Sequence, residues 1–178
     1  MKKILFVCLG NICRSSSAEE VMRTLIRKEG LEREIEVDSA GILSYHQGEL
    51  PDSRMRMHAS RRGYNLTHRS RPVCTDDFYH FDMIIGMDDR NIEDLIERAP
   101  DLETEKKIRR MTDYCRVKMV IMYPILIMEG RKVSRMYWIF WKTLAPDCLK
   151  VFVLFLQLRI TDSSVIHRFQ FFLKQRFH

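Results

Sequence analysis

The sequence lacks any apolar run that approaches the roughly 20 residues of a membrane-crossing helix. Its N-terminal apolar stretch, Ile4 to Leu9, is too short for the core of a secretion signal. The five cysteines are odd in number and lack zinc-like spacing, which argues against a disulfide framework. With only 7 glycines and 5 prolines in 178 residues, collagen-like and low-complexity chains are excluded. We expect a globular cytoplasmic chain without a metal ion or other cofactor.

Charge and aromatic residues are unevenly distributed along the chain. Residues 1–116 carry 20 Lys and Arg against 21 Asp and Glu, whereas residues 117–178 carry 10 against 3, so the net charge of +6 arises in the second segment. That segment also holds 11 of the 18 aromatic residues. We therefore expect an α/β domain over residues 1–116 and a basic, aromatic-rich tail over residues 117–178 that is poorly ordered or loosely packed. Nucleic acid or an anionic membrane is not an expected partner, because charge without periodicity is usual for a solvated surface.

Residues 1–116 alternate short apolar runs with amphipathic stretches. The pattern predicts strands at 4–7, 34–39, 81–86 and 107–112, and helices at 17–29, 52–62 and 88–98. Ser16 or Ser17 is expected to cap the first helix, with Glu19 and Glu20 in its first turn. Strands separated by helices form parallel βαβ units. The predicted fold is α/β, a three-layer sandwich with a small four-stranded parallel sheet.

The loop after the first predicted strand contains the candidate catalytic and phosphate-binding residues. It reads Cys8-Leu9-Gly10-Asn11-Ile12-Cys13-Arg14-Ser15 and leads into a predicted helix. Backbone N–H groups at a helix N-terminus favour an anion, and an arginine adds a planar fork that matches two phosphate oxygens. The same positive field favours the thiolate of Cys8, and Ser15 can donate its hydroxyl to that sulfur. We expect residues Leu9 to Arg14 to bind phosphate opposite a cysteine nucleophile.

The Cys-x5-Arg spacing alone is weak evidence, because a buried structural cysteine beside a solvated arginine gives the same pattern. The preceding strand, the following helix and the residues inside the loop favour the anion site. Gly10 and Asn11 tolerate left-handed backbone, and the Asn11 amide can tie the loop together.

Over residues 1–116 the sequence resembles the low-molecular-weight protein-tyrosine phosphatases. The motifs that carry the resemblance are Val7 to Ser15, Asp38-Ser39-Ala40-Gly41 and Phe81 to Asp88. The resemblance implies that Cys8 is the nucleophile that forms a phosphocysteine and that Arg14 clamps the phosphate. It also implies a loop-shaping hydrogen-bond network made of Asn11, Ser15, Ser39 and His68.

Further features of the family bear on redox control and substrate choice. Cys13 occupies the position from which family members form a reversible disulfide with the nucleophile under peroxide. Tyr45 falls in the loop whose aromatic residues flank the substrate ring, although an ordinary loop tyrosine is an equal alternative. Relatives with threonine at the position of Ile12 tend toward phosphoarginine, so isoleucine favours phosphotyrosine. Arsenate reductases that share the loop use a closely spaced cysteine pair, whereas Cys74 and Cys115 are far apart.

One family element is missing. The family protonates the leaving phenolate from an aspartate in an Asp-Pro-aromatic loop after the last strand, and this sequence contains no such motif. General acid assistance of this kind contributes about 10²–10⁴ in rate. We therefore expect impaired phosphotyrosine hydrolysis, and the alternative is a non-catalytic phosphate- or phosphotyrosine-binding domain.

A shifted reading frame offers an account of the missing acid. If each new codon takes the last base of one codon and the first two of the next, Val120 to Gly130 can encode Asp-His-Val-Pro-Asp-Pro-Tyr-Tyr-Gly-Gly. Some residues of this frame are forced whatever the third base, as in the Val, Leu and Asp encoded across Met136 to Ile139. We hypothesise a one-base slip near residues 117–120, which the coding DNA can test directly.

Overall fold

The computed structural model describes residues 1–114, and for Thr112 and Tyr114 it describes the backbone alone. Strands and helices alternate along this part of the chain. The strands are β1 (Lys2–Cys8), β2 (Ile35–Gly41), β3 (Met83–Gly86) and β4 (Ile108–Arg110). The helices are α1 (Arg14–Glu29), α2 (Ser53–Ser60), α3 (Thr75–His80), α4 (Asp89–Arg98) and α5 (Leu102–Glu105), followed by a 3-10 turn at Met111–Tyr114. The predicted tail, residues 117–178, and the proposed shifted frame lie outside the described residues.

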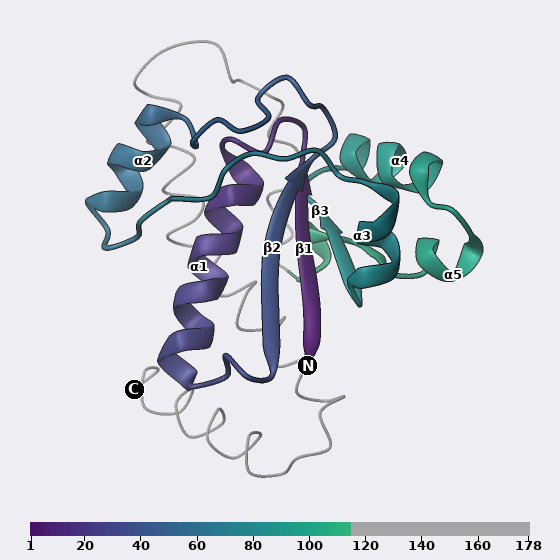
Figure 1. The fold of residues 1–178 in the computed structure, drawn as a ribbon, viewed down its shortest axis with the longest axis horizontal. Helices are drawn as coiled ribbons and strands as arrows, with labels where there is room; N and C mark the ends of the chain where they lie inside the picture. Colours follow the sequence, from purple (N-terminus) through teal and green to yellow (C-terminus); the bar gives the residue numbers. More distant parts are fainter. Residues whose placement is uncertain (115–178) are drawn as a thin grey trace.

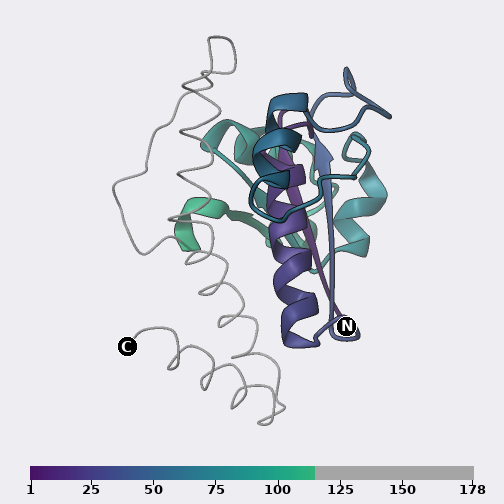
Figure 2. The same ribbon diagram turned by 90° about the vertical axis from the view of Figure 1, so that its left-hand side faces the viewer.

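The four strands form one parallel sheet in the order β2-β1-β3-β4. Figure 1 shows α1 and α2 on one side of this sheet and α3, α4 and α5 on the other. Viewed from the side in Figure 2, α1 runs alongside the strands. The α/β three-layer prediction is therefore confirmed.

Alternate residues of β1 divide between two apolar cores. Ile4 and Phe6 are buried with α1 and with Met55 and Ala59 of α2. On the opposite face, the core joins β1 residues to side chains of α3 and α4, among them Leu5, Val7, Phe78 and Leu95. Burial on both faces explains why β1 is a nearly continuous apolar run. It also fixes the end of β1, where the candidate loop begins, between the two layers.

The start of the first helix differs from the prediction. The helix begins at Arg14 rather than near residue 17, its N-cap is Cys13, and neither Ser16 nor Ser17 caps it. Both serines are buried inside the helix, and Glu19 and Glu20 are also buried, beyond the first turn. The capping prediction is wrong because the first turn of α1 is held against the strand ends by tertiary contacts that local sequence does not report.

Two short helices were not predicted. The six residues of α3 and the four of α5 are too short to show a helical period, and each is stabilised by a capping box at Cys74 or Asp101. Within the described part of the chain, no helix is long and apolar enough to span a membrane.

Candidate active site

The candidate site lies where β1 passes into α1. Cys8 is the last residue of β1 and is only 3% exposed, and Arg14 is the first residue of α1. The Cys8 sulfur lies 3.0 Å from the Ser15 hydroxyl oxygen, within hydrogen-bond distance. Cys13, the N-cap, makes no side-chain hydrogen bond to the helix. The amide dipoles of the first turn of α1 therefore act on a thiol, a hydroxyl and a guanidinium held within eight residues.

Asn11 holds the loop in its shape. It has a φ of 55°, which makes it the one non-glycine residue with positive φ in the described part of the chain, whereas Gly10 does not adopt a positive φ. Its side-chain amide nitrogen donates to the hydroxyls of Ser15, at 2.9 Å, and Ser39, at 2.8 Å. Its amide oxygen pairs with His68 Nε2 at 2.9 Å and accepts from the Arg71 backbone N–H at 3.0 Å. Four bonds from three segments therefore fix this left-handed residue.

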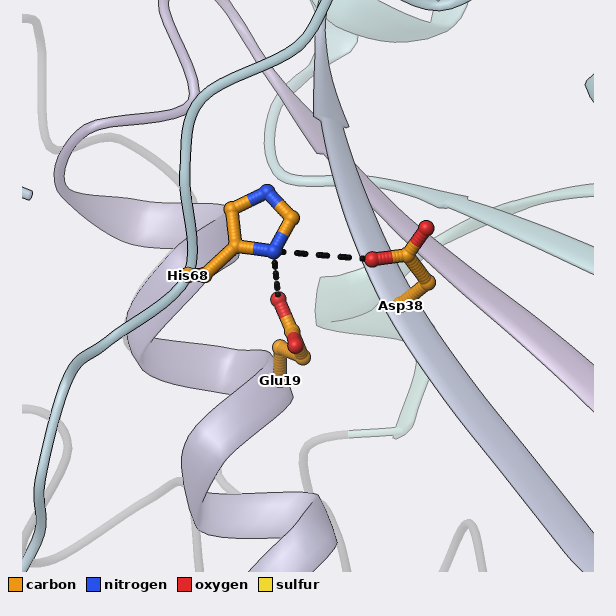
Figure 3. Close-up of side chains that lie close together, drawn as sticks. All are labelled: Glu19, Asp38 and His68. Atoms are coloured by element: carbon orange, nitrogen blue, oxygen red, sulfur yellow. Dashed lines mark ion pairs between the residues drawn. The ribbon is translucent and has the colours of Figure 1, made fainter. Parts of the chain in front are cut away.

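His68, which bonds Asn11, is itself held by polar contacts with two acidic side chains. Figure 3 shows the His68 ring between Glu19 of α1 and Asp38 of β2. His68 Nδ1 lies 3.0 Å from a Glu19 oxygen and 3.5 Å from an Asp38 oxygen. Glu19 also accepts from the Ser39 hydroxyl at 2.6 Å and pairs with Arg23. These contacts orient the imidazole so that its other nitrogen reaches Asn11.

Asp38 extends this network to α3 through Arg71. The Arg71 guanidinium bonds Asp38 and, through both outer nitrogens, Asp77 of α3. Glu19, Asp38 and His68 contact one another and also bond Ser39, Asn11 and Arg71, so the group forms one connected hydrogen-bond network.

Asp88 reaches the loop from the next strand. It follows β3, accepts the Asn91 N–H at 2.8 Å as the N-cap of α4, and pairs through its other oxygen with Arg14. The parallel strands β1 and β3 are neighbours, so the residues that follow them meet at one sheet edge. Asp88 thus positions the guanidinium that the sequence analysis assigns to phosphate binding.

Cys13 and Cys8 are both free thiols, and their environments differ. Burial, together with the nearby charges of Asp52 and Cys8, raises the pKa of Cys13 from its usual 9.0 to about 12, against the opposing charges of Arg14 and Arg54. Cys13 is therefore a neutral thiol at physiological pH. The disulfide that the family resemblance implies stays a prediction.

The rim of the site is built by the segment that contains Tyr45. Tyr45 is 82% exposed and lies beside His46, whose ring would contact a side chain added at Gly10. Ser70 joins this rim to the loop: its hydroxyl donates to the Gly10 carbonyl at 3.0 Å, and its carbonyl accepts the Gly48 N–H at 2.7 Å. The rim therefore has a fixed position relative to the loop.

The structure brings together most of the residues that the sequence analysis selected. Cys8, Asn11, Ser15, Ser39 and His68 form one connected set, and Arg14 lies at the same helix start. Leu9, Gly10, Ile12 and Cys13 complete the loop as partly buried residues. Tyr45 stands apart on the rim. The analysis missed Glu19, Asp38, Arg71 and Asp88 as participants, although Asp38 and Asp88 stand within the motifs that carry the family resemblance.

Comparisons with known proteins agree with this geometry. The family model for low molecular weight phosphotyrosine protein phosphatase matches residues 3–121. The chain belongs to this family. A Synechocystis protein named as a low molecular weight protein-tyrosine-phosphatase is 43% identical over 112 residues, which is 63% of this chain and 71% of that protein. The human low molecular weight phosphotyrosine protein phosphatase is 39% identical over 121 residues, covering 67% of this chain and 77% of its own.

Solved structures give the same family. A crystal structure of a protein tyrosine phosphatase from Entamoeba histolytica superimposes with a TM-score of 0.79 at 38% identity, covering 88% of this chain and 97% of that chain. The family prediction is confirmed.

Proposed function

We propose that this low-molecular-weight phosphatase hydrolyses phosphotyrosine in proteins through a phosphocysteine on Cys8. The observation that carries the proposal is the Cys8 sulfur, held 3.0 Å from the Ser15 hydroxyl at the start of α1, where helix dipoles and Arg14 favour an anion. A hydroxyl hydrogen bond and a positive field both stabilise a sulfur anion. Nucleophile and anion site are therefore in the same loop.

The two chemical steps follow from this arrangement. The Cys8 thiolate attacks phosphorus and forms the S–P bond while the P–O bond to the phenol breaks, and the phenolate leaves with the electron pair and takes up a proton. Water then attacks phosphorus, loses a proton and displaces the thiolate, which the Ser15 hydroxyl stabilises as the S–P bond breaks. Arg14, oriented by Asp88, binds phosphate oxygens in both steps.

We further propose that turnover is limited by protonation of the leaving group. The sequence contains no Asp-Pro-aromatic motif that could supply the family's general acid. Without such an acid, an ester of an acidic phenol reacts through a stable phenolate, whereas a tyrosyl ester loses about 10²–10⁴ in rate. The rate should therefore fall steeply as the basicity of the leaving group rises.

Rapid quenching of the full-length protein with an aryl phosphate tests the proposal. We expect a phosphoryl group on the peptide that contains Cys8, no turnover in Cys8→Ser, and near-normal turnover in Cys74→Ser, which changes an exposed cysteine outside the loop. A series of aryl phosphates then measures the leaving-group dependence. Phosphate binding without a phosphocysteine would instead support a non-catalytic phosphotyrosine-binding domain, and turnover by Cys8→Ser would reject the nucleophile assignment.

A further inference from the structure

A band of arginines lies next to the phosphate loop. Between residues 51 and 72 the sequence has six arginines and a single acidic residue, Asp52. Five of these arginines are exposed: Arg54, Arg56, Arg61, Arg62 and Arg69. Most of them belong to α2 or to the turn that follows it. This surface has a strong positive charge that the catalytic loop itself does not require.

The band begins at the loop. The backbone N–H of Asp52, the N-cap of α2, donates to the carbonyl of Ile12 at 2.9 Å, so the first turn of α2 is attached directly to the phosphate loop. Arg54 pairs with Asp52 at 2.9 Å. Its positive charge still acts inside the loop, where it is among the charges that oppose the rise in the pKa of Cys13. The near end of α2 is therefore electrostatically coupled to the site.

The far end of α2 is also positive. Burial, followed by the charges of Arg62 and Arg61, lowers the pKa of His58 below its usual 6.5. The Arg62 guanidinium donates to the His58 carbonyl at 2.9 Å, which holds its charge beside the helix end. Arg54 and His58 lie four residues apart in α2, so they share one helix face, and Arg61 and Arg62 follow at the end of that helix. An arginine stripe, which we define as Arg54, Arg61 and Arg62, thus runs from the phosphate loop to the end of α2.

The length of the stripe sets the size of the ligand that it fits. From Asp52 to Arg62 the helical rise gives about 15 Å, the span of four to five residues of extended peptide. An acidic side chain within that distance of a phosphotyrosine can meet a guanidinium while the phosphate occupies the loop. Because these charges are exposed, the attraction is moderate and is screened by salt.

We propose that the arginine stripe binds acidic residues within four to five positions of the phosphotyrosine, on one side of it, and so selects acidic substrates. The inference rests on the proposed function, since it concerns peptides bound at the same loop. Electrostatic attraction of this kind raises both the encounter rate and the specificity for a partner of opposite charge.

Two phosphotyrosine peptides of equal length, one with Glu and one with Gln in the flanking positions, test the proposal. The full-length enzyme should show a kcat/KM about three- to tenfold higher for the acidic peptide, and the ratio should fall toward one as salt rises from about 0.05 M to about 0.5 M. In the double variant Arg61→Gln, Arg62→Gln the ratio should approach one even at low salt. Turnover of p-nitrophenyl phosphate, which has no flanking residues, should be unchanged.

A matched control neutralises two exposed cations far from the loop, Lys28 in the last turn of α1 and Arg33 four residues beyond its end. Lys28→Gln, Arg33→Gln removes the same net charge, so a loss of acidic preference there would mean that total charge, and not the stripe, is responsible. Equal kcat/KM for the two peptides in the unaltered enzyme would also overturn the proposal, as would a variant that alters binding only to vesicles rich in phosphatidylserine.

Binding measurements separate this inference from the proposed function. Fluorescence anisotropy of the same peptides with Cys8→Ser protein, with and without the stripe substitutions, reports the acidic preference without turnover. If the acidic peptide binds more tightly and the stripe variant removes that advantage while the unaltered enzyme forms no phosphocysteine on rapid quenching, the stripe is supported and the hydrolytic proposal fails. If the unaltered enzyme forms phosphocysteine but the two peptides bind the Cys8→Ser protein equally, the stripe is rejected and the hydrolytic proposal stands.

Discussion

Replacing Asn11 tests the reasoning about the loop most directly, because this residue combines an unusual backbone with four side-chain bonds. An alanine in left-handed backbone costs about 1–2 kcal/mol. The same change removes the acceptor for two donors, His68 Nε2 and the Arg71 N–H, and each buried group left unpaired costs about 1–3 kcal/mol. We expect Asn11→Ala to lower the free energy of unfolding by about 3–8 kcal/mol, a large share of the 5–15 kcal/mol typical of a domain.

A glycine at the same position separates the two contributions. Asn11→Gly loses the same bonds but tolerates positive φ, so it should be about 1–2 kcal/mol more stable than Asn11→Ala. Urea unfolding followed by circular dichroism at 222 nm measures the free energy of unfolding of both variants. Competitive inhibition by inorganic phosphate measures how tightly the loop of each variant binds phosphate. If the alanine variant is as stable as the glycine variant, the backbone argument is wrong. If both unfold like the unaltered protein, the side-chain network does not stabilise the loop.

The remaining predictions concern the clamp and the second loop cysteine. Asp88→Asn keeps a residue that caps α4 but removes the charge facing Arg14, so we expect about a two- to fivefold loss in kcat/KM with little change in Tm. Because its pKa is raised to about 12, Cys13 should have about a thousandfold less thiolate than a cysteine with the usual value of 9.0. Iodoacetamide at neutral pH should therefore label exposed Cys74 faster than Cys13, as mass spectrometry can show, and faster labelling of Cys13 would contradict the assignment.

The parts of the fold that sequence reasoning predicted are those whose signal is local. The apolar run of β1 and the amphipathic spacing of α1 each report burial that the structure bears out. The start of α1 was misplaced because its serines resemble N-caps, while the actual start is decided by contacts of Asn11 and Ser15 with other segments. No window of the sequence around residue 16 contains that information.

The residues of the candidate site likewise divide into those that the local sequence predicts and those that it does not. Cys8, Arg14 and Ser15 could be selected from one loop because strand, glycine and helix follow each other there. The roles of Asp88 and Arg71 depend on pairs separated by 74 residues, for Arg14 with Asp88, and by 60 residues, for Asn11 with Arg71. Such contacts are set by the order of strands in the sheet, and a single sequence does not reveal them without a resemblance.

The contacts of residues 68–71 have a consequence for how the enzyme matures. A chain emerging from the ribosome exposes Cys8 and Arg14 early, but the partners that fix Asn11 and Gly10 lie 57 and 60 residues further along. Closing a loop of that length is slow compared with forming a local helix. The nascent chain therefore carries the Cys8 thiol before it has a phosphate site, and we expect affinity for phosphate only after residues 68–71 have docked on the loop.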